Sequence, residues 1–151
     1  MQKITPFLWF DKQAEEAAKF YVSVFKDSKM GQVSRYGEGM PLPKGTVMTA
    51  AFEIGGQSFI ALNGGPQFKF TEAVSFVVNC GTQKEIDYYW DKLTAGGGKE
   101  VQCGWLKDRY GLSWQIVPAV LPELVKKSGR VMEALLQMKK LDIAALQRAA
   151  A

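Results

Sequence analysis

Few residues in this chain could do acid–base, nucleophilic or metal chemistry. No histidine occurs among its 151 residues. Histidine is the commonest metal ligand and the usual general base near neutral pH, so either role would need another side chain. Ser–His and Cys–His nucleophile pairs are excluded for the same reason. The candidates that remain are thiols, carboxylates and neutral polar groups.

The two cysteines, Cys80 and Cys103, are too few for a disulfide framework. Thiolate chemistry would need a neighbouring cation or a helix N-terminus to lower the thiol pKa, and the sequence indicates neither. We expect both to be small buried residues, with Cys80 ending one strand and Cys103 lying in a later one.

Four carboxylates lie near the ends of expected strands. Carboxylates can bind metals or transfer protons, but the usual exposure of Asp and Glu strongly favours ordinary surface solvation for each of them. We therefore give a displaced metal site little weight. The four are Glu53, Glu72, Glu100 and Asp108.

The composition is that of an average globular protein, with 47% hydrophobic and 23% charged residues. The net charge is +4, but Lys and Arg are scattered among Asp and Glu, so no nucleic-acid-binding patch is expected. No basic leader precedes a long apolar run, and no stretch approaches the roughly 20 apolar residues of a membrane span. We expect a reduced, cytoplasmic protein in which residues 1–151 form one domain.

The first half of the chain predicts the element order β, α, β, β, β. Alternating apolar residues indicate strands, and apolar residues at helical spacing after Asp11 indicate a helix. Gly55-Gly56 separates two strand patterns and favours a tight hairpin whose turn residues need positive φ. The expected elements are a strand at 4–10, a helix at 13–25, and strands at 30–36, 47–54 and 58–62.

The same order then repeats, which defines two modules at about 1–66 and 67–120. Residue identity between the halves is too weak to show this repeat, so the evidence is the order of elements. The expected elements are a strand at 73–79, a helix at 83–94, and strands at 100–105, 106–108 and 112–117.

A helical tail, 121–151, follows the repeat. Pro122 suits a first helical turn, Gly129 interrupts, and a helix is expected over 131–148. Its apolar stripe, Val131, Leu135 and Met138, must be covered either by its own sheet or by a partner subunit.

Several motifs in this order resemble PhnB-like proteins of the vicinal oxygen chelate superfamily, which includes glyoxalases, bleomycin-resistance proteins and dioxygenases. They are FYVSVF after the first strand, the hairpin GGQSFIALNGG, DRYGLSWQIVP, and the tail VMEALLQMKKLDIAALQRA. The resemblance implies an α+β fold in which two βαβββ modules form a cupped mixed sheet, with helices behind it and a pocket inside. It also implies a homodimer.

Catalytic members of that superfamily hold a divalent metal with four side chains, usually His or Glu, from the first and fourth strands of both modules. The matching positions here are Thr5, Ala61, Ala73 (or Ser75, on the same face) and Gln115. Hydroxyl, methyl and neutral amide groups replace the usual ligands. We therefore expect no metal and no cofactor.

This branch often carries a 3-demethylubiquinone methyltransferase name. A common S-adenosylmethionine site needs a Gly-rich turn between a strand and a helix. Here Gly55-Gly56 and Gly64-Gly65 join or end antiparallel strands. Methyl transfer is therefore not the expected activity.

The aromatic residues are divided between the expected core and the expected pocket. Trp90 and Trp114 should be core, whereas Trp105 could form a rim. For Phe7 and Trp9, pocket lining and simple packing both remain open. Ser75 and Gln115 would orient a ligand. The expected ligand-binding residues are Thr5, Phe7, Trp9, Phe59, Ser75 and Gln115.

The leading hypothesis is a metal-independent small-molecule-binding protein, or an enzyme of unknown reaction. The alternative is a metal-dependent lyase or dioxygenase with ligands outside the positions above. A purely structural or interaction module is a third possibility. The expected partners are a small molecule and a second copy of the chain.

Overall fold

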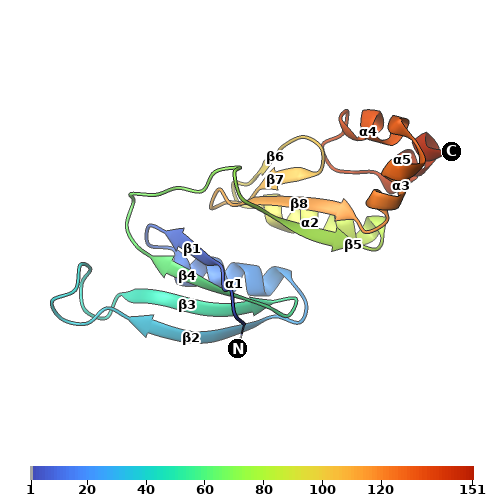
Figure 1. Ribbon diagram of the computed structural model, residues 1–151. Coiled ribbons are helices and arrows are strands. Elements are labelled where there is room, and N and C mark those ends of the chain that lie inside the picture. The colour runs from blue at the N-terminus through green and yellow to red at the C-terminus, as the bar shows by residue number, and fades with distance from the viewer. Residues whose placement is uncertain (1) are drawn as a thin grey trace. The chain divides into compact units, whose positions relative to one another are not determined.

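The computed structural model describes residues 2–151. The chain divides into two compact units, here called the first module, which ends at Lys69, and the second module, Phe70–Ala151. Each contains one four-stranded mixed sheet and the order β, α, β, β, β, as Figure 1 shows. The α+β class and the repeat of two modules are confirmed. Their union into one domain with one cupped sheet stays a prediction.

In the first module the strand order is β1-β4-β3-β2. Strand β1 is parallel to β4, whereas β4 with β3 and β3 with β2 are antiparallel. Gly55 and Gly56 have φ of 55° and 81°, as the hairpin requires. The elements are β1 Phe7–Phe10, α1 Ala14–Val24, β2 Lys29–Arg35, β3 Val47–Ile54 and β4 Gln57–Asn63.

Helix α1 covers one face of this sheet. Its buried side consists mainly of alanines, which let the helix approach the strands closely, and Tyr21 stacks on Phe52 of β3 with ring centroids 5.9 Å apart. The alternate residues Ala50, Phe52 and Ile54 of β3 are buried on this covered face. The residues between them therefore point to the opposite, uncovered face.

In the second module the strand order is β5-β8-β7-β6, the same arrangement as in the first. The side chain of Thr82 caps α2 by accepting from the backbone N–H of Glu85. Trp90 and Trp114 are 2% and 3% exposed, so their expected core positions are confirmed. The elements are β5 Ser75–Cys80, α2 Gln83–Thr94, β6 Lys99–Glu100, β7 Trp105–Lys107 and β8 Ser113–Pro118.

The strand expected at 100–105 is wrong, because β6 ends at Glu100 and a turn follows. Cys103 and Gly104 have φ of 62° and 85°, which no strand accommodates. Cys103 therefore lies in a turn rather than in a strand. A Cβ added at Gly104 would lie 3.0 Å from the Leu141 side chain, so the tail packs directly on this turn.

The single helix expected at 131–148 is also wrong, because the tail forms three short helices. Asp142 caps the last of them by accepting from the N–H of Ala145. The carbonyls of Met138 and Lys139 accept hydrogen bonds from the N–H groups of Cys103 and Gly104, at 2.7 and 2.8 Å, instead of continuing a helix. The helices are α3 Leu121–Lys127, with Pro122 in its first turn as expected, α4 Gly129–Leu135 and α5 Ile143–Ala150.

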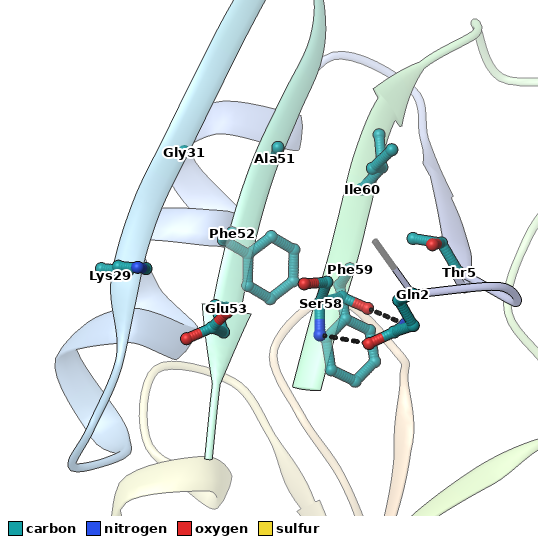
Figure 2. Close-up of a pocket in the computed structure, with 10 residues that line it drawn as sticks. All are labelled: Gln2, Thr5, Lys29, Gly31, Ala51, Phe52, Glu53, Ser58, Phe59 and Ile60. Atoms are coloured by element: carbon teal, nitrogen blue, oxygen red, sulfur yellow. Dashed lines mark hydrogen bonds between the residues drawn. The ribbon is translucent and has the colours of Figure 1, made fainter. Parts of the chain in front are cut away.

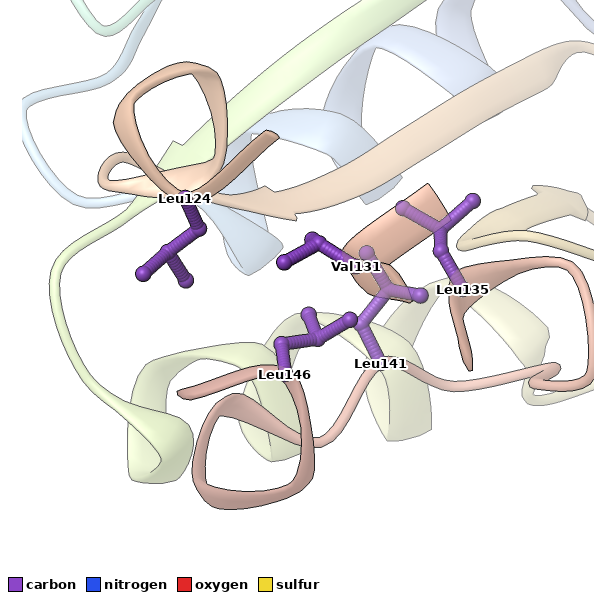
Figure 3. Close-up of a cluster of buried hydrophobic side chains, with 5 residues drawn as sticks. All are labelled: Leu124, Val131, Leu135, Leu141 and Leu146. Carbon is purple, nitrogen blue, oxygen red and sulfur yellow. The ribbon is translucent and has the colours of Figure 1, made fainter. Parts of the chain in front are cut away.

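The apolar stripe of the tail is buried within the chain. Val131 is 0% and Leu135 8% exposed, and Met138 packs against the same cluster. Figure 3 shows its five buried members, Leu124, Val131, Leu135, Leu141 and Leu146. The stripe therefore needs no partner subunit to cover it.

Among residues 2–151, no helix combines the length and apolar character needed to cross a membrane.

Candidate functional site

A pocket of about 490 Å³ lies on the face of the first sheet that α1 leaves uncovered, here called the first open face. Its volume falls within the usual range for small-molecule sites, about 300–1,000 Å³. Figure 2 shows the lining side chains, which come from the N-terminal segment and strands β2, β3 and β4. They are Gln2, Thr5, Lys29, Gly31, Ala51, Phe52, Glu53, Ser58, Phe59 and Ile60.

One row of polar residues crosses the three strands of the pocket. Lys29 pairs with Glu53 across β2 and β3, and Glu53 pairs with Ser58 across β3 and β4. Gln2 holds one end of the row, since its side chain donates to the carbonyl of Ser58 and accepts from the N–H of Ser58, both at 3.1 Å. The row places a cation, a carboxylate and a hydroxyl side by side.

A second row, two residues further along the strands, is small and apolar. Ala51 pairs with Ile60 across β3 and β4, and Gly31 of β2 lies beside Ala51. A Cβ added at Gly31 would lie 3.1 Å from the Cβ of Ala51. The pocket floor at Gly31 and Ala51 therefore consists of backbone and a single methyl group.

Three of the expected ligand-binding residues come from the first strand and the segment before it. Thr5 lines the pocket. Phe7 is 58% exposed and lies next to Ile60 in the parallel register of β1 and β4. Trp9 donates its indole N–H to the carbonyl of Gly65 at 2.9 Å, and its ring meets the ring of Phe68 edge to face at 4.9 Å. For Trp9 the structure favours packing against the loop after β4.

Phe59 and Ala61 do not lie on the first open face, contrary to expectation. The parallel register pairs Phe7 with Ile60, so Ile60 shares the face of Phe7, and Phe59 and Ala61 point to the face that α1 covers. Phe59 borders the pocket, but it is 5% exposed and its ring stacks on Phe52 at 5.3 Å. The fourth-strand position that faces the open side is therefore Ile60, an alkyl side chain.

Ser75 and Gln115 lie together on the corresponding face of the second sheet, here called the second open face. The Gln115 amide donates to the Ser75 hydroxyl at 2.9 Å, and Gln115 also pairs with Trp105 across β7 and β8. On the same strand as Gln115, the buried hydroxyl of Ser113 has no hydrogen-bond partner within residues 2–151. Ser75 and Gln115 are thus brought together, but they are bonded to each other.

Of the four carboxylates, two accept hydrogen bonds from tryptophan side chains, one forms an ion pair, and one lines the pocket. Asp108 is 2% exposed, which corrects the expected surface position, and it accepts from the indole N–H of Trp114 at 2.9 Å. Glu100 accepts from the indole N–H of Trp90 at 2.6 Å. Glu72 forms an ion pair with Lys107, and this contact lowers the pKa of the Glu72 carboxyl. Glu53 lies in the pocket.

The thiol of Cys80 is poorly suited to chemistry. It is 0% exposed, and burial, followed by the nearby Glu85 carboxylate, raises its pKa to about 12. A thiol with such a pKa is almost entirely protonated near neutral pH and is a weak nucleophile.

The superfamily's divalent metal does not fit the residues present. The positions that face the open sides offer the hydroxyls of Thr5 and Ser75, the alkyl chain of Ile60, and the Gln115 amide, which already donates to Ser75. Neutral oxygens of this kind, without carboxylate or imidazole, are a poor ligand set for such metals. Within residues 2–151, no three His, Cys, Asp or Glu side chains form a group that could hold a metal ion.

The sequence prediction missed most of the polar row, namely Gln2, Lys29 and Ser58. The Gly55-Gly56 hairpin contained part of the signal, since a two-residue turn pairs Ile54 with Gln57 and therefore Glu53 with Ser58. The bulge in β2 between Met30 and Val33 shifts the register of that strand, so the position of Lys29 was not readable from alternation.

Comparison with known proteins supports the family. The family described as "3-demethylubiquinone-9 3-methyltransferase" matches residues 2–117, so most of the tail lies outside the match. A PhnB protein from Bacillus cereus, described as a putative member of that methyltransferase class, is 41% identical with a TM-score of 0.71. The alignment covers 78% of this chain and 100% of the other. A comparison with curated proteins found no match.

Two more distant structures share the fold. A fosfomycin resistance protein from Listeria monocytogenes is 14% identical, with a TM-score of 0.54 and coverage of 82% of this chain and 97% of the other. A glyoxalase/bleomycin resistance protein from Albidiferax ferrireducens is 11% identical, with a TM-score of 0.51 and coverage of 76% and 95%. The chain belongs to the 3-demethylubiquinone-9 3-methyltransferase family, which includes this PhnB protein.

Proposed function

We propose that the first open face binds a small organic molecule without the help of a metal ion. The observation that supports this is the pocket of about 490 Å³, in which apolar floor and polar side chains lie next to each other. Sites for small molecules typically combine a mainly apolar lining with a few polar groups that orient the ligand.

The six expected binding residues would have different roles in this function. Thr5 lines the pocket directly, and Phe7 offers exposed apolar surface beside it. Ser75 and Gln115 would act on the second open face, where a ligand must compete with the hydrogen bond between them. Trp9 would shape the site through the loop after β4, and Phe59 would line the pocket with the small part of its ring that is exposed.

A thermal-shift screen of small apolar and amphipathic compounds tests this function. A ligand that binds only the native state raises the melting temperature as its concentration increases. Ala51→Leu places a large side chain on the pocket floor and should abolish the shift. If no compound stabilises the wild-type chain, or if every shift survives in Ala51→Leu, this function is wrong.

Elemental analysis distinguishes metal-independent binding from the alternative, a metal-dependent lyase or dioxygenase. Protein purified without chelator should contain no near-stoichiometric divalent metal. Bound metal that is lost in Gln115→Ala or Glu53→Ala would favour a lyase or dioxygenase instead.

We also propose a cytoplasmic homodimer that binds no nucleic acid. The edge strands β1 and β5 carry exposed apolar residues, Phe7 at 58% and Val77 at 49%, and such edges are usually covered or paired. Light scattering should give twice the mass of the 16.8 kDa chain. A monomer mass that persists at high protein concentration would rule the dimer out.

A further inference from the structure

The polar row of the pocket contains one positive and one negative side chain that form no ion pair within residues 2–151. Lys29 and Glu53 are direct neighbours on antiparallel strands, so their side chains leave the sheet on the same side. Within residues 2–151, neither side chain has an ion pair or a hydrogen bond. Both the ammonium and the carboxylate are therefore available to a ligand.

The Ser58 hydroxyl extends this row on the third strand. Gln2 bonds only the backbone of Ser58, which leaves the hydroxyl directed toward the pocket next to Glu53 (Figure 2). A hydroxyl both donates and accepts, so it can serve either charge of a ligand head group. The head-group end of the pocket thus offers a cation, an anion and a neutral group in one line.

The apolar row lies two residues further along the same strands. Two residues of a strand span about 6.7 Å, so a ligand whose head group contacts the polar row can place an attached apolar group over this second row. Gly31 and Ala51 form a flat strip there, and Ile60 adds an alkyl side chain at its end. A planar or compact apolar group fits over this strip.

We infer that the pocket selects a small zwitterion of the amino-acid type with an apolar side chain. Its carboxylate contacts Lys29, its ammonium contacts Glu53, and its side chain lies over Gly31 and Ala51. A ligand with only an anionic head would pair with Lys29 but would lie beside the like charge of Glu53, and a cationic head would meet the reverse problem. This inference rests on the proposed function, since it names the class of molecule that the same pocket takes.

Isothermal titration calorimetry on the full chain tests the inference with four probes. Each probe contains one phenyl group, and the probes differ in their head groups. They are L-phenylalanine, 3-phenylpropionic acid, 2-phenylethylamine and 2-phenylethanol. Phenylalanine should bind about threefold to fivefold tighter than either singly charged probe, because an ion pair at an accessible site contributes up to about 1 kcal/mol. Phenylethanol should bind weakest.

Two variants assign the charges. Lys29→Gln should remove the preference for phenylalanine over phenylethylamine, and Glu53→Gln should remove its preference over phenylpropionic acid. Lys26→Gln is the matched control, because Lys26 is exposed and does not line the pocket. It should leave all four affinities unchanged.

The outcomes distinguish the binding of a zwitterion from the more general proposal that the pocket binds a small molecule. Equal binding of phenylethanol and phenylalanine, unchanged affinities in Lys29→Gln and Glu53→Gln, or no binding of any probe would each overturn the zwitterion. The proposed function survives these results if another compound stabilises the wild type but not Ala51→Leu. If no compound does so, both fail.

Discussion

The two modules share one strand order but use the polar groups on their open faces differently. On the first open face, Lys29 and Glu53 stand side by side without a bond to each other or to any other side chain in residues 2–151. On the second, Gln115 donates to Ser75, and Lys107 forms an ion pair with Glu72. The first face therefore has free polar groups where the second has internal pairs.

The modules also differ at their C-terminal ends. The second module carries the tail, which is fastened by the Gln83 side chain, a donor to the carbonyl of Leu141 at 3.0 Å and an acceptor from the N–H of Ile143 at 2.8 Å. An ion pair between Lys140 and Asp87 adds to this attachment. The second module is thus reinforced by contacts between its tail and α2, and the first module has no such tail.

The largest expected effect comes from the tail. Leu141 is 0% exposed, and Leu141→Ala should lower the free energy of unfolding by about 2–5 kcal/mol, the usual range for truncating a buried leucine. Urea denaturation measures the loss. Relative to the wild type, Leu141→Ala should increase amide hydrogen exchange more in α2, to which the tail is bonded, than in α1. Such a result would sharpen the contrast between the modules.

Leu136→Ala is the matched control, because Leu136 is 56% exposed and its truncation should change stability by no more than about 0.5 kcal/mol. Equal loss of protection in α1 and α2 after Leu141→Ala would break the comparison, since the two modules would then unfold as one unit.

Much of this fold was predictable because local signals agree with the final structure. Helix α2 begins and ends at the predicted residues, since Thr82 caps it and its apolar residues recur at helical spacing. The Gly55-Gly56 turn was readable for a similar reason. The tail was not, because a continuous helical pattern cannot indicate that the carbonyls of Met138 and Lys139 bond a turn far away in the sequence.

The candidate site was only partly predictable. Alternation placed Thr5 and Phe7 on one side of their strand, but it could not fix the register between β1 and the distant β4, and this register decides between Ile60 and Ala61. The burial of Asp108 was also hidden. Its carboxylate is stabilised by donors from Tyr110, Leu112 and Trp114, which a sequence does not place around it.

The second prediction concerns that buried carboxylate. Asp108→Asn should lower the free energy of unfolding by about 3 kcal/mol, because the amide NH2 would face a donor and leave a buried N–H unpaired. Guanidinium denaturation at neutral pH measures this loss, and the indole N–H resonance of Trp114 should shift. Asp91→Asn on the exposed side of α2 should be neutral. A neutral Asp108→Asn would mean that the second module does not depend on its internal polar bonds.

The third prediction tests the two open faces directly. Gln115→Ala should cost about 1 kcal/mol, the net value of one hydrogen bond, because it leaves the Ser75 hydroxyl without its partner. Ser58→Ala on the first open face should cost close to nothing, since that hydroxyl has no bond in residues 2–151. Thermal denaturation of both variants measures the difference. Equal costs would remove the distinction between a bonded face and a free one.

The smallest effect is expected at the ion pair of the second open face. Contact with Lys107 holds the pKa of the Glu72 carboxyl below its ordinary value. A carboxyl whose folded pKa lies below its unfolded pKa adds stability above the unfolded pKa, and this contribution is lost as the pH falls through the folded pKa. Both side chains are largely exposed, so water and salt screen the pair and its effect on stability should be slight. An NMR titration is therefore the better measurement: Lys107→Gln should raise the pKa of Glu72. Lys84→Gln removes the same charge from an exposed position of α2 and should leave the pKa of Glu72 unchanged. If both variants shift Glu72 alike, the ion pair does not set its pKa and the second open face is not distinguished by internal pairs.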